Sequence, residues 1–297
     1  MTLPARRWRG RIVRIDHGGV TGGDEVSPTG GCDLPSHAAS LNDLVVPCDL
    51  PCEDRPKLRL GVGWTKRWTV TYLTSAAEVT RAVADLSDGW LPAQLPVRRF
   101  SWATGQRHRP GLQYMACTGR HHGFESLAEQ RLLLALDFLK VDDVVAQPFE
   151  LRFVGADGWR RHVPDFLAVD RDGVSVIDVR PAELIRAEDR IRFAATAEVA
   201  AVLGWRFLLV AGWRPGIMSN LDALSAQRRA LVDHLDLQPQ LISLAGHGPV
   251  SFAQLVSATA APAVARAHAL HLIWHHRLGV DLAAPLGDES AVWAITA

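Results

Sequence analysis

The stretch VPDFLAVDRDGVSVIDVRP, residues 163–181, constrains the fold more than any other part of the chain. Two apolar runs flank the sequence D-R-D-G, which predicts antiparallel strands joined by a tight turn. The second run is almost continuously apolar over residues 174–179, as in a strand that is buried on both faces, yet it contains Asp178. A carboxylate in such a strand is costly unless it is paired or bound to a metal ion. The acids therefore either pair with nearby arginines on an ordinary hairpin or form part of a metal site.

The segments around this hairpin predict an α/β fold. An amphipathic helical pattern precedes it, a second long helical pattern follows it, and a buried strand comes last. The order helix, three strands, helix, strand indicates a mixed sheet flanked by helices on both faces. The expected elements are a helix at 124–140, strands at 144–155, 159–170 and 173–181, a helix at 187–204 and a strand at 205–213.

The chain is long enough for two domains at ~150 residues each. Pattern and composition divide it into an irregular N-terminal arm (1–57), an α+β subdomain with a basic loop (58–118), the mixed-sheet core (119–212), a linker (213–239) and a winged-helix-like domain (240–297). In the subdomain we expect two strands and then a helix over 75–90, capped by Ser75 with Glu78. In the last domain, two helices and a short hairpin give the winged-helix pattern.

Cysteines are few and lie mostly in the N-terminal arm. A C-x3-C pair and one more cysteine lie near two histidines, which leaves open either a zinc site or a flexible arm with free thiols. These residues are Cys32, Cys48, Cys52, His17 and His37. So few cysteines do not make a disulfide scaffold, and the most apolar long window is interrupted by Glu198 and Arg206. We expect a cytoplasmic protein without a signal peptide and without a membrane partner.

The basic residues are locally concentrated. The formal net charge is +0, so no global field favours nucleic acid. Residues 97–120, however, contain five arginines, interleaved aromatic residues and no acid, which suits a phosphate backbone, although a solvated loop fits the pattern equally. The predicted DNA-binding residues are Arg98, Arg99, Arg107, Arg109 and Arg120. The 240–297 region has few arginines, so we expect it to dock protein instead of reading DNA.

Acidic side chains converge on the hairpin. Asp178 and Arg180 are two residues apart and share one face of a strand. Asp165 follows Pro164, which interrupts the neighbouring strand, so the two aspartates can meet at one ion. Glu125 and Glu129 share a face of the preceding helix and can supply a third carboxylate.

Phosphodiester cleavage needs a hard divalent cation held by oxygens, an activated water and a cation near the scissile phosphate. Glu129, Asp165, Asp178 and Arg180 meet these needs, and Glu125 is the reserve acid. We therefore expect a DNA endonuclease with Mg²⁺ as its cofactor and Mn²⁺ as a substitute.

The runs TGRHHGFESLAEQRLLLALDF, VVAQPFEL and HVPDFLAVDRDGVSVIDVRP resemble the TnsA-like endonuclease subunit of heteromeric transposases. This family has the restriction-endonuclease-like, PD-(D/E)xK fold, and the resemblance covers roughly 98–212. It places the family's S-x-x-E at Ser126 and Glu129, its aspartate at Asp165, and its last motif at Asp178 and Arg180. The resemblance implies cleavage at the 5′ ends of a mobile element, with a DDE-type transposase and an AAA+ regulator as partners.

The last motif departs from the family because Arg180 stands where a lysine is expected. Arginine stays charged and cannot act as a base at neutral pH. Lys140, at the end of the helix about three turns from Glu129, cannot replace that lysine. The alternative function is therefore a catalytically silent nuclease-fold scaffold that binds DNA and the transposase, and a stand-alone repair or defence nuclease is a third reading.

Overall fold

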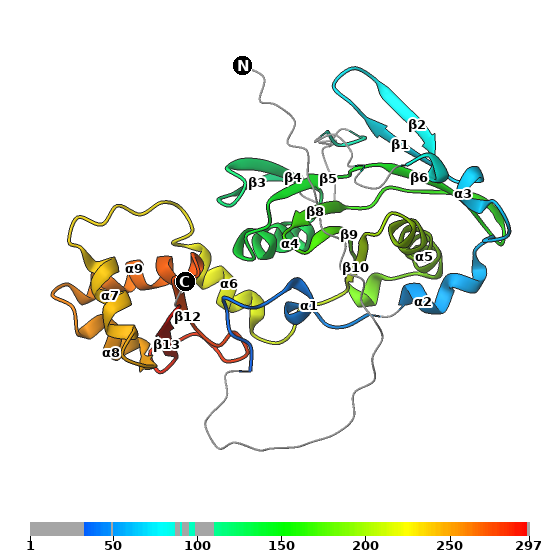
Figure 1. Cartoon of the computed structure of the whole chain (residues 1–297). Helices are drawn as coiled ribbons and strands as arrows, with labels where there is room; N and C mark the ends of the chain where they lie inside the picture. Colours follow the sequence, from blue (N-terminus) through cyan, green and yellow to red (C-terminus); the bar gives the residue numbers. More distant parts are fainter. Residues whose placement is uncertain (1–32, 49, 87–89, 91–94, 99–109, 296–297) are drawn as a thin grey trace. The chain divides into compact units, whose positions relative to one another are not determined.

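The computed structural model describes residues 33–48, 50–86, 90, 95–98 and 110–295. Its central sheet has the strand order β10-β9-β8-β5 (Figure 1). These strands are β5 (Asp143–Ala146), β8 (Phe166–Asp170), β9 (Gly173–Val179) and β10 (Arg206–Val210). β8 is antiparallel to both β5 and β9, whereas β10 is parallel to β9. The predicted mixed sheet and its D-R-D-G turn between β8 and β9 are confirmed.

Helices cover both faces of this sheet. On one face, α4 (Leu127–Phe138) packs Leu132 and Leu136 against Ile177 of β9. On the other face, α5 (Ala187–Val202) packs Ala195 against Val176, the residue next to Ile177. Both strand residues are 0% exposed, as the nearly continuous apolar run predicted.

A second sheet, with the order β2-β1-β6-β7, is antiparallel throughout. It contains β1 (Thr69–Leu73), β2 (Glu78–Ala82), β6 (Glu150–Gly155) and β7 (Gly158–His162). The chain therefore forms separate strands where long single strands were expected at 144–155 and 159–170. Gln147, with a positive φ of 47°, and Pro148 separate β5 from β6, and Pro164 lies between β7 and β8.

The helix expected at 75–90 is wrong. Its first part is β2, followed by the 3-10 turn η2 (Val83–Asp85), and β2 pairs with β1 from Leu73↔Glu78 to Thr69↔Ala82. Thr74 closes the turn, since its hydroxyl donates to the Ala77 carbonyl at 2.8 Å and accepts from the Ala77 amide at 3.0 Å. Strand pairing here outweighs a local capping signal. The strand expected from Leu58 is also absent, because that residue forms only an isolated bridge to Gly155.

Residues 33–57 differ from the expected irregular arm. They contain the short helices α1 (Leu41–Leu44), α2 (Leu50–Asp54) and the turn η1 (Arg55–Lys57), and α3 (Trp64–Arg67) follows. Leu44 is 0% exposed, and Asp54 forms ion pairs with Lys57 and Arg190. Of the residues that left a zinc site open, His17 and Cys32 lie outside the described residues, as does the side chain of Cys52.

The expected linker contains the helix α6 (Ile217–Ser225), which packs against α4 through Leu221. The following elements are α7 (Leu237–Ala245), β11 (Val250–Ser251), α8 (Phe252–Ser257), α9 (Pro262–Trp274), β12 (Leu278–Gly279) and β13 (Ala291–Ala294). Pro262 begins α9, and β13 lies between β11 and β12 in a small antiparallel sheet. Of the helices in the described ranges, none is long and apolar enough to cross a bilayer.

Candidate active site

Asp165 lies one residue before β8, at the point where Pro164 ends the preceding segment. The Val179 amide donates to its Oδ2 at 2.7 Å, and the Gln147 amide donates to its backbone carbonyl at 2.8 Å. These two bonds fix Asp165 between the end of β9 and the residue that follows β5. The register Phe166↔Ile177 places Asp165 and Asp178 at neighbouring positions across the two strands.

Asp178 lies near the end of β9 and is 1% exposed. The ring of His162, from β7, donates from Nε2 to both oxygens of its carboxylate at 3.0 Å each. His162 was not among the predicted site residues, although it lies only three residues before Asp165. The position of His162 could have indicated it, because this residue ends the strand β7 directly before Asp165 and the β8–β9 hairpin.

Glu129 lies in the first turn of α4 and belongs to the cap of that helix. Its Oε1 accepts from the Ser126 hydroxyl at 2.9 Å, and its Oε2 accepts from the Glu125 amide at 2.8 Å. The Ser126 hydroxyl in turn accepts from the Glu129 amide at 3.2 Å. The Ser126 hydroxyl therefore caps α4, and the Glu129 carboxylate accepts from that hydroxyl and from the amide of the residue before the cap.

Electrostatics link the three acids. Burial, and then the negative charges of Asp178 and Glu129, raise the pKa of Asp165 well above its ordinary value, against the Val179 bond and the charge of Arg98. Burial also raises the pKa of Glu129, although its bonds to Glu125 and Ser126 oppose this. The charges of Asp178 and Glu129 thus both act on Asp165.

Arg180 is directed to another partner. Its Nε donates to the Leu184 carbonyl at 3.3 Å and lies 3.6 Å from Oδ2 of Asp189 in α5. Arg98 pairs with Glu125 at 3.1 Å, and its positive charge opposes the rise in the pKa of both Asp165 and Glu129. Arg98 therefore acts electrostatically on these carboxylates, whereas the sequence had placed it only among the DNA contacts.

Arg120, another predicted DNA contact, forms an ion pair with Asp143 of β5. Arg99, Arg107 and Arg109 lie outside the described residues. In the part of the chain that the structure describes, no group of three or more His, Cys, Asp and Glu side chains is arranged to hold a metal ion.

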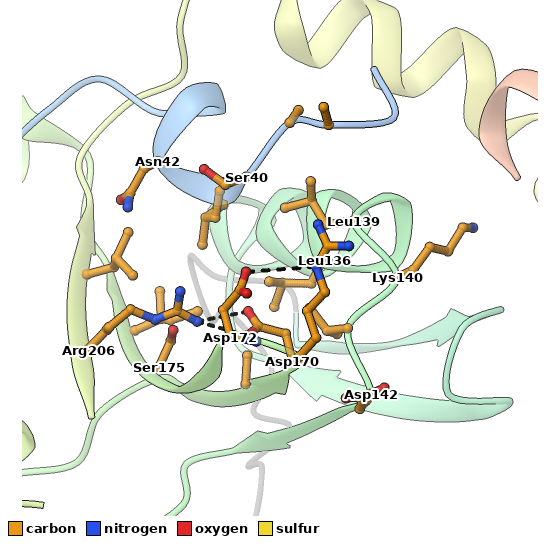
Figure 2. A pocket seen from close by; sticks show the side chains of 18 of the residues that line it. Ser40, Asn42, Leu136, Leu139, Lys140, Asp142, Asp170, Asp172, Ser175 and Arg206 are labelled. Carbon is orange, nitrogen blue, oxygen red and sulfur yellow. Dashed lines mark hydrogen bonds and ion pairs between the residues drawn. The ribbon is translucent and has the colours of Figure 1, made fainter. Parts of the chain in front are cut away.

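A cavity of about 370 Å³ lies at the other end of β8 and β9 (Figure 2). None of the predicted site residues lines this cavity. Asp170 and Arg206 form an ion pair in it at 2.9 Å, and Lys140 extends away from that pair. The Lys140 amine lies 5.1 Å from the centroid of the Trp274 ring. This location agrees with the expectation that Lys140 does not replace the family's lysine.

No protein-family model matches this chain, and a search of curated proteins also gives no match.

Proposed function

We propose that this chain is a metal-dependent DNA endonuclease subunit of a heteromeric transposase, of the TnsA-like type, which cuts at the 5′ ends of a mobile element. The observation that carries the proposal is the raised pKa of the Asp165 carboxyl group. Its pKa is raised by burial and by two further carboxylates, so the group is unfavourably placed as an anion on its own. A divalent cation would neutralise this concentration of negative charge.

The order of the elements supports a restriction-endonuclease-like core within the mixed α/β fold. α4, β5, β8, β9, α5 and β10 follow one another as helix, three strands, helix and strand, and the β6–β7 hairpin is an insertion that joins the second sheet. The order of helices and strands from α7 to β13 likewise supports a winged-helix domain. In that region Arg266 pairs with Asp288 at 2.8 Å, which favours docking to the transposase or the AAA+ regulator over reading of DNA.

The donor set suits Mg²⁺, which prefers carboxylate oxygens. Asp165 and Asp178 would hold the ion from neighbouring strands. Glu129 would join them when its carboxylate leaves the Ser126 hydroxyl and the Glu125 amide, at a cost of about 1.5–3 kcal/mol for a hydrogen bond to a charged group. A bound Mg²⁺ supplies polarisation of the phosphoryl group and a more acidic water.

The protein's own cations would position the DNA. Arg98 lies beside Glu125 and lines a cavity of about 370 Å³ on the outer face of the second sheet. The cavity is also lined by Thr69, Thr71, Thr80, Arg152 and Arg161, and by the acids Glu78 and Glu150, of which Glu150 pairs with Arg161. Hydroxyl and guanidinium groups donate to phosphate oxygens, so the three arginines, which outnumber the two acids, would contact the strand that enters the site. Arg180 would act on the phosphate only after release from Asp189.

The test is nicking of supercoiled plasmid by the full chain in Mg²⁺, in Mn²⁺ and in EDTA. We expect nicking in either metal, no nicking in EDTA, and none by Asp165→Ala. The matched control is Asp172→Ala, which removes a carboxylate that is 65% exposed in the β8–β9 turn. Undiminished nicking by a folded Asp165→Ala protein would contradict the assignment.

A silent scaffold is the second candidate, and a specific observation favours it. Both oxygens of Asp178 are already bonded to His162, and Arg180 is paired with Asp189. Calorimetric titration with Mn²⁺ separates the two candidates. Binding by the wild type that is lost in Asp178→Ala supports the nuclease, whereas the absence of binding by the wild type supports the scaffold.

A further inference from the structure

A groove of about 670 Å³ opens between the hairpin of β3 (Gly111–Met115) and β4 (Arg120–Phe124), the segment after α6, and the C-terminal half of α9. Its lining is Tyr114, Ala116, His121, Arg228, Arg229, Ala230, His271 and His275. None of these side chains is acidic. The groove is therefore a local concentration of positive charge on a chain whose formal net charge is +0.

Aromatic rings and a guanidinium lie together on the hairpin side of the groove. The ring centroids of Tyr114 and His121 are 5.3 Å apart, and the guanidinium of Arg229 lies 5.6 Å from the centroid of the Tyr114 ring. Tyr114 is partly exposed, and both His121 and Arg229 are exposed. Because this guanidinium lies over the Tyr114 ring, a base would stack on that face only after Arg229 moves from the ring to a phosphate. Base stacking on an aromatic ring together with phosphate contacts from a cation is how proteins bind single-stranded nucleic acid.

Two histidines bind the backbone of the segment that carries Arg228 and Arg229. The ring of His271 donates from Nδ1 to the Gln227 carbonyl at 2.8 Å, and the ring of His275 donates from Nε2 to the Arg228 carbonyl at 3.2 Å. Burial, together with the charge of Lys140, lowers the pKa of His275 to about 4. That ring is therefore neutral at pH 7, and Arg228 and Arg229 provide permanent positive charge in the groove.

We propose that this groove binds one nucleotide of single-stranded DNA, with Arg228 and Arg229 on the phosphate and Tyr114 stacked on the base. Bases inside a duplex do not present their faces, so the aromatic side of the groove selects an unpaired strand. His121 precedes Glu125 by four residues, roughly 13 Å along an extended strand. The identity of the bound strand rests on the proposed nuclease function. The groove would add a DNA contact that is separate from the three acids.

The experiment measures fluorescence anisotropy of a labelled oligothymidylate of about 12 nucleotides, and of a duplex of the same length, with the full chain in EDTA over a range of salt. We expect tighter binding of the single strand. Tyr114→Leu is expected to weaken that binding by roughly 5- to 100-fold without changing the salt slope, since it removes stacking only. Arg229→Ala is expected to lower the slope by about 0.7, the value for one lost phosphate contact.

The control is Arg171→Ala, which removes the same charge from a side chain that is 86% exposed in the β8–β9 turn. It is expected to bind like the wild type with an unchanged slope. His121→Ala, at an exposed position, provides a second test of the aromatic face if Tyr114→Leu does not fold. Wild-type affinity in the folded aromatic variants, or an unchanged slope in Arg229→Ala, overturns the proposal.

The same proteins distinguish this proposal from the nuclease function. Metal-dependent nicking by the wild type, combined with unaltered oligonucleotide binding by the groove variants, overturns the groove alone. Groove-dependent binding by a chain that does not nick in any metal supports the groove and overturns the nuclease function.

Discussion

The substitution Asp165→Asn should stabilise the protein at pH 8. Folding raises the pKa of Asp165, so the folded chain holds this proton more tightly than the unfolded chain. Its contribution to stability is therefore present below the ordinary pKa of 3.8 and is lost as the pH rises through the folded-state value. Above that window the wild type bears the full cost of burial and of repulsion from Asp178 and Glu129, which asparagine removes.

The size of the effect is a difference between two contributions. Asparagine still accepts from the Val179 amide, but a neutral hydrogen bond is weaker than a charged one by about 1 kcal/mol. The net rise in the pKa of Asp165 means that burial and repulsion exceed this gain. We expect a net stabilisation of the order of 1 kcal/mol at pH 8, or about 2–4 °C in Tm for a chain of this size.

The assay is thermal unfolding followed by circular dichroism at several pH values, with and without Mg²⁺. The gain of Asp165→Asn over the wild type should shrink toward pH 3. Mg²⁺ at about 100 times its Kd should stabilise the wild type by about 2.7 kcal/mol, roughly 5–10 °C, and stabilise the variant much less. The control is Asp172→Asn, which makes the same change in the exposed turn.

Two outcomes would refute this reasoning. A lower Tm of Asp165→Asn at pH 8 would show that the aspartate is favourably placed as an anion. Equal stabilisation of the wild type and Asp165→Asn by Mg²⁺ would show that the ion binds elsewhere.

Three further variants test other parts of the structure. Phe138→Ala should lose about 3–5 kcal/mol in urea unfolding, because this 0% exposed ring packs against Trp274, while Leu127→Ala in the same helix, 63% exposed, should lose less than about 0.5. Asp54→Asn should lose about 2 kcal/mol of stability at pH 7, because it breaks the ion pairs with Lys57 and Arg190. These pairs lower the pKa of Asp54 despite its burial, so the difference between the two proteins should vanish below the folded-state pKa. Acid titration of the wild type and the variant measures this difference. Arg180→Lys should increase the rate of plasmid nicking if the reaction uses a proton held at this position, and an unchanged rate would limit position 180 to a structural pairing with Asp189.

The core of the fold could be predicted because its signals are periodic and strong. The apolar run at 174–179 specified a strand covered on both faces, and Val176 and Ile177 do pack against helices on opposite faces. The helices α4 and α5 fall inside the ranges expected from their apolar periodicity. These elements need only local sequence to define them.

The misplaced elements depend on contacts between distant residues. The segment after Ser75 contains a capping-box sequence, but its pairing with β1 makes it a strand. The irregular composition of residues 33–57 gave no periodic signal, yet the ion pair between Asp54 and Arg190 joins positions 136 residues apart. Local propensity is a weak guide wherever such tertiary contacts decide the conformation.

The proximity of the two aspartates was predictable, whereas the partner of Arg180 was not. The turn after β8 brings β9 back beside it, so Asp165 and Asp178 lie at neighbouring positions. Strand alternation put Arg180 beside Asp178, but the chain turns after β9 and Asp189 of the following helix takes the guanidinium. Arg98 pairs with the reserve acid Glu125 from a separate segment, where no periodicity linked it to the hairpin. If the nuclease proposal holds, Arg98→Ala should therefore reduce nicking more than Arg180→Ala, and the reverse order in the plasmid assay would return the phosphate contact to the position that the family resemblance assigns.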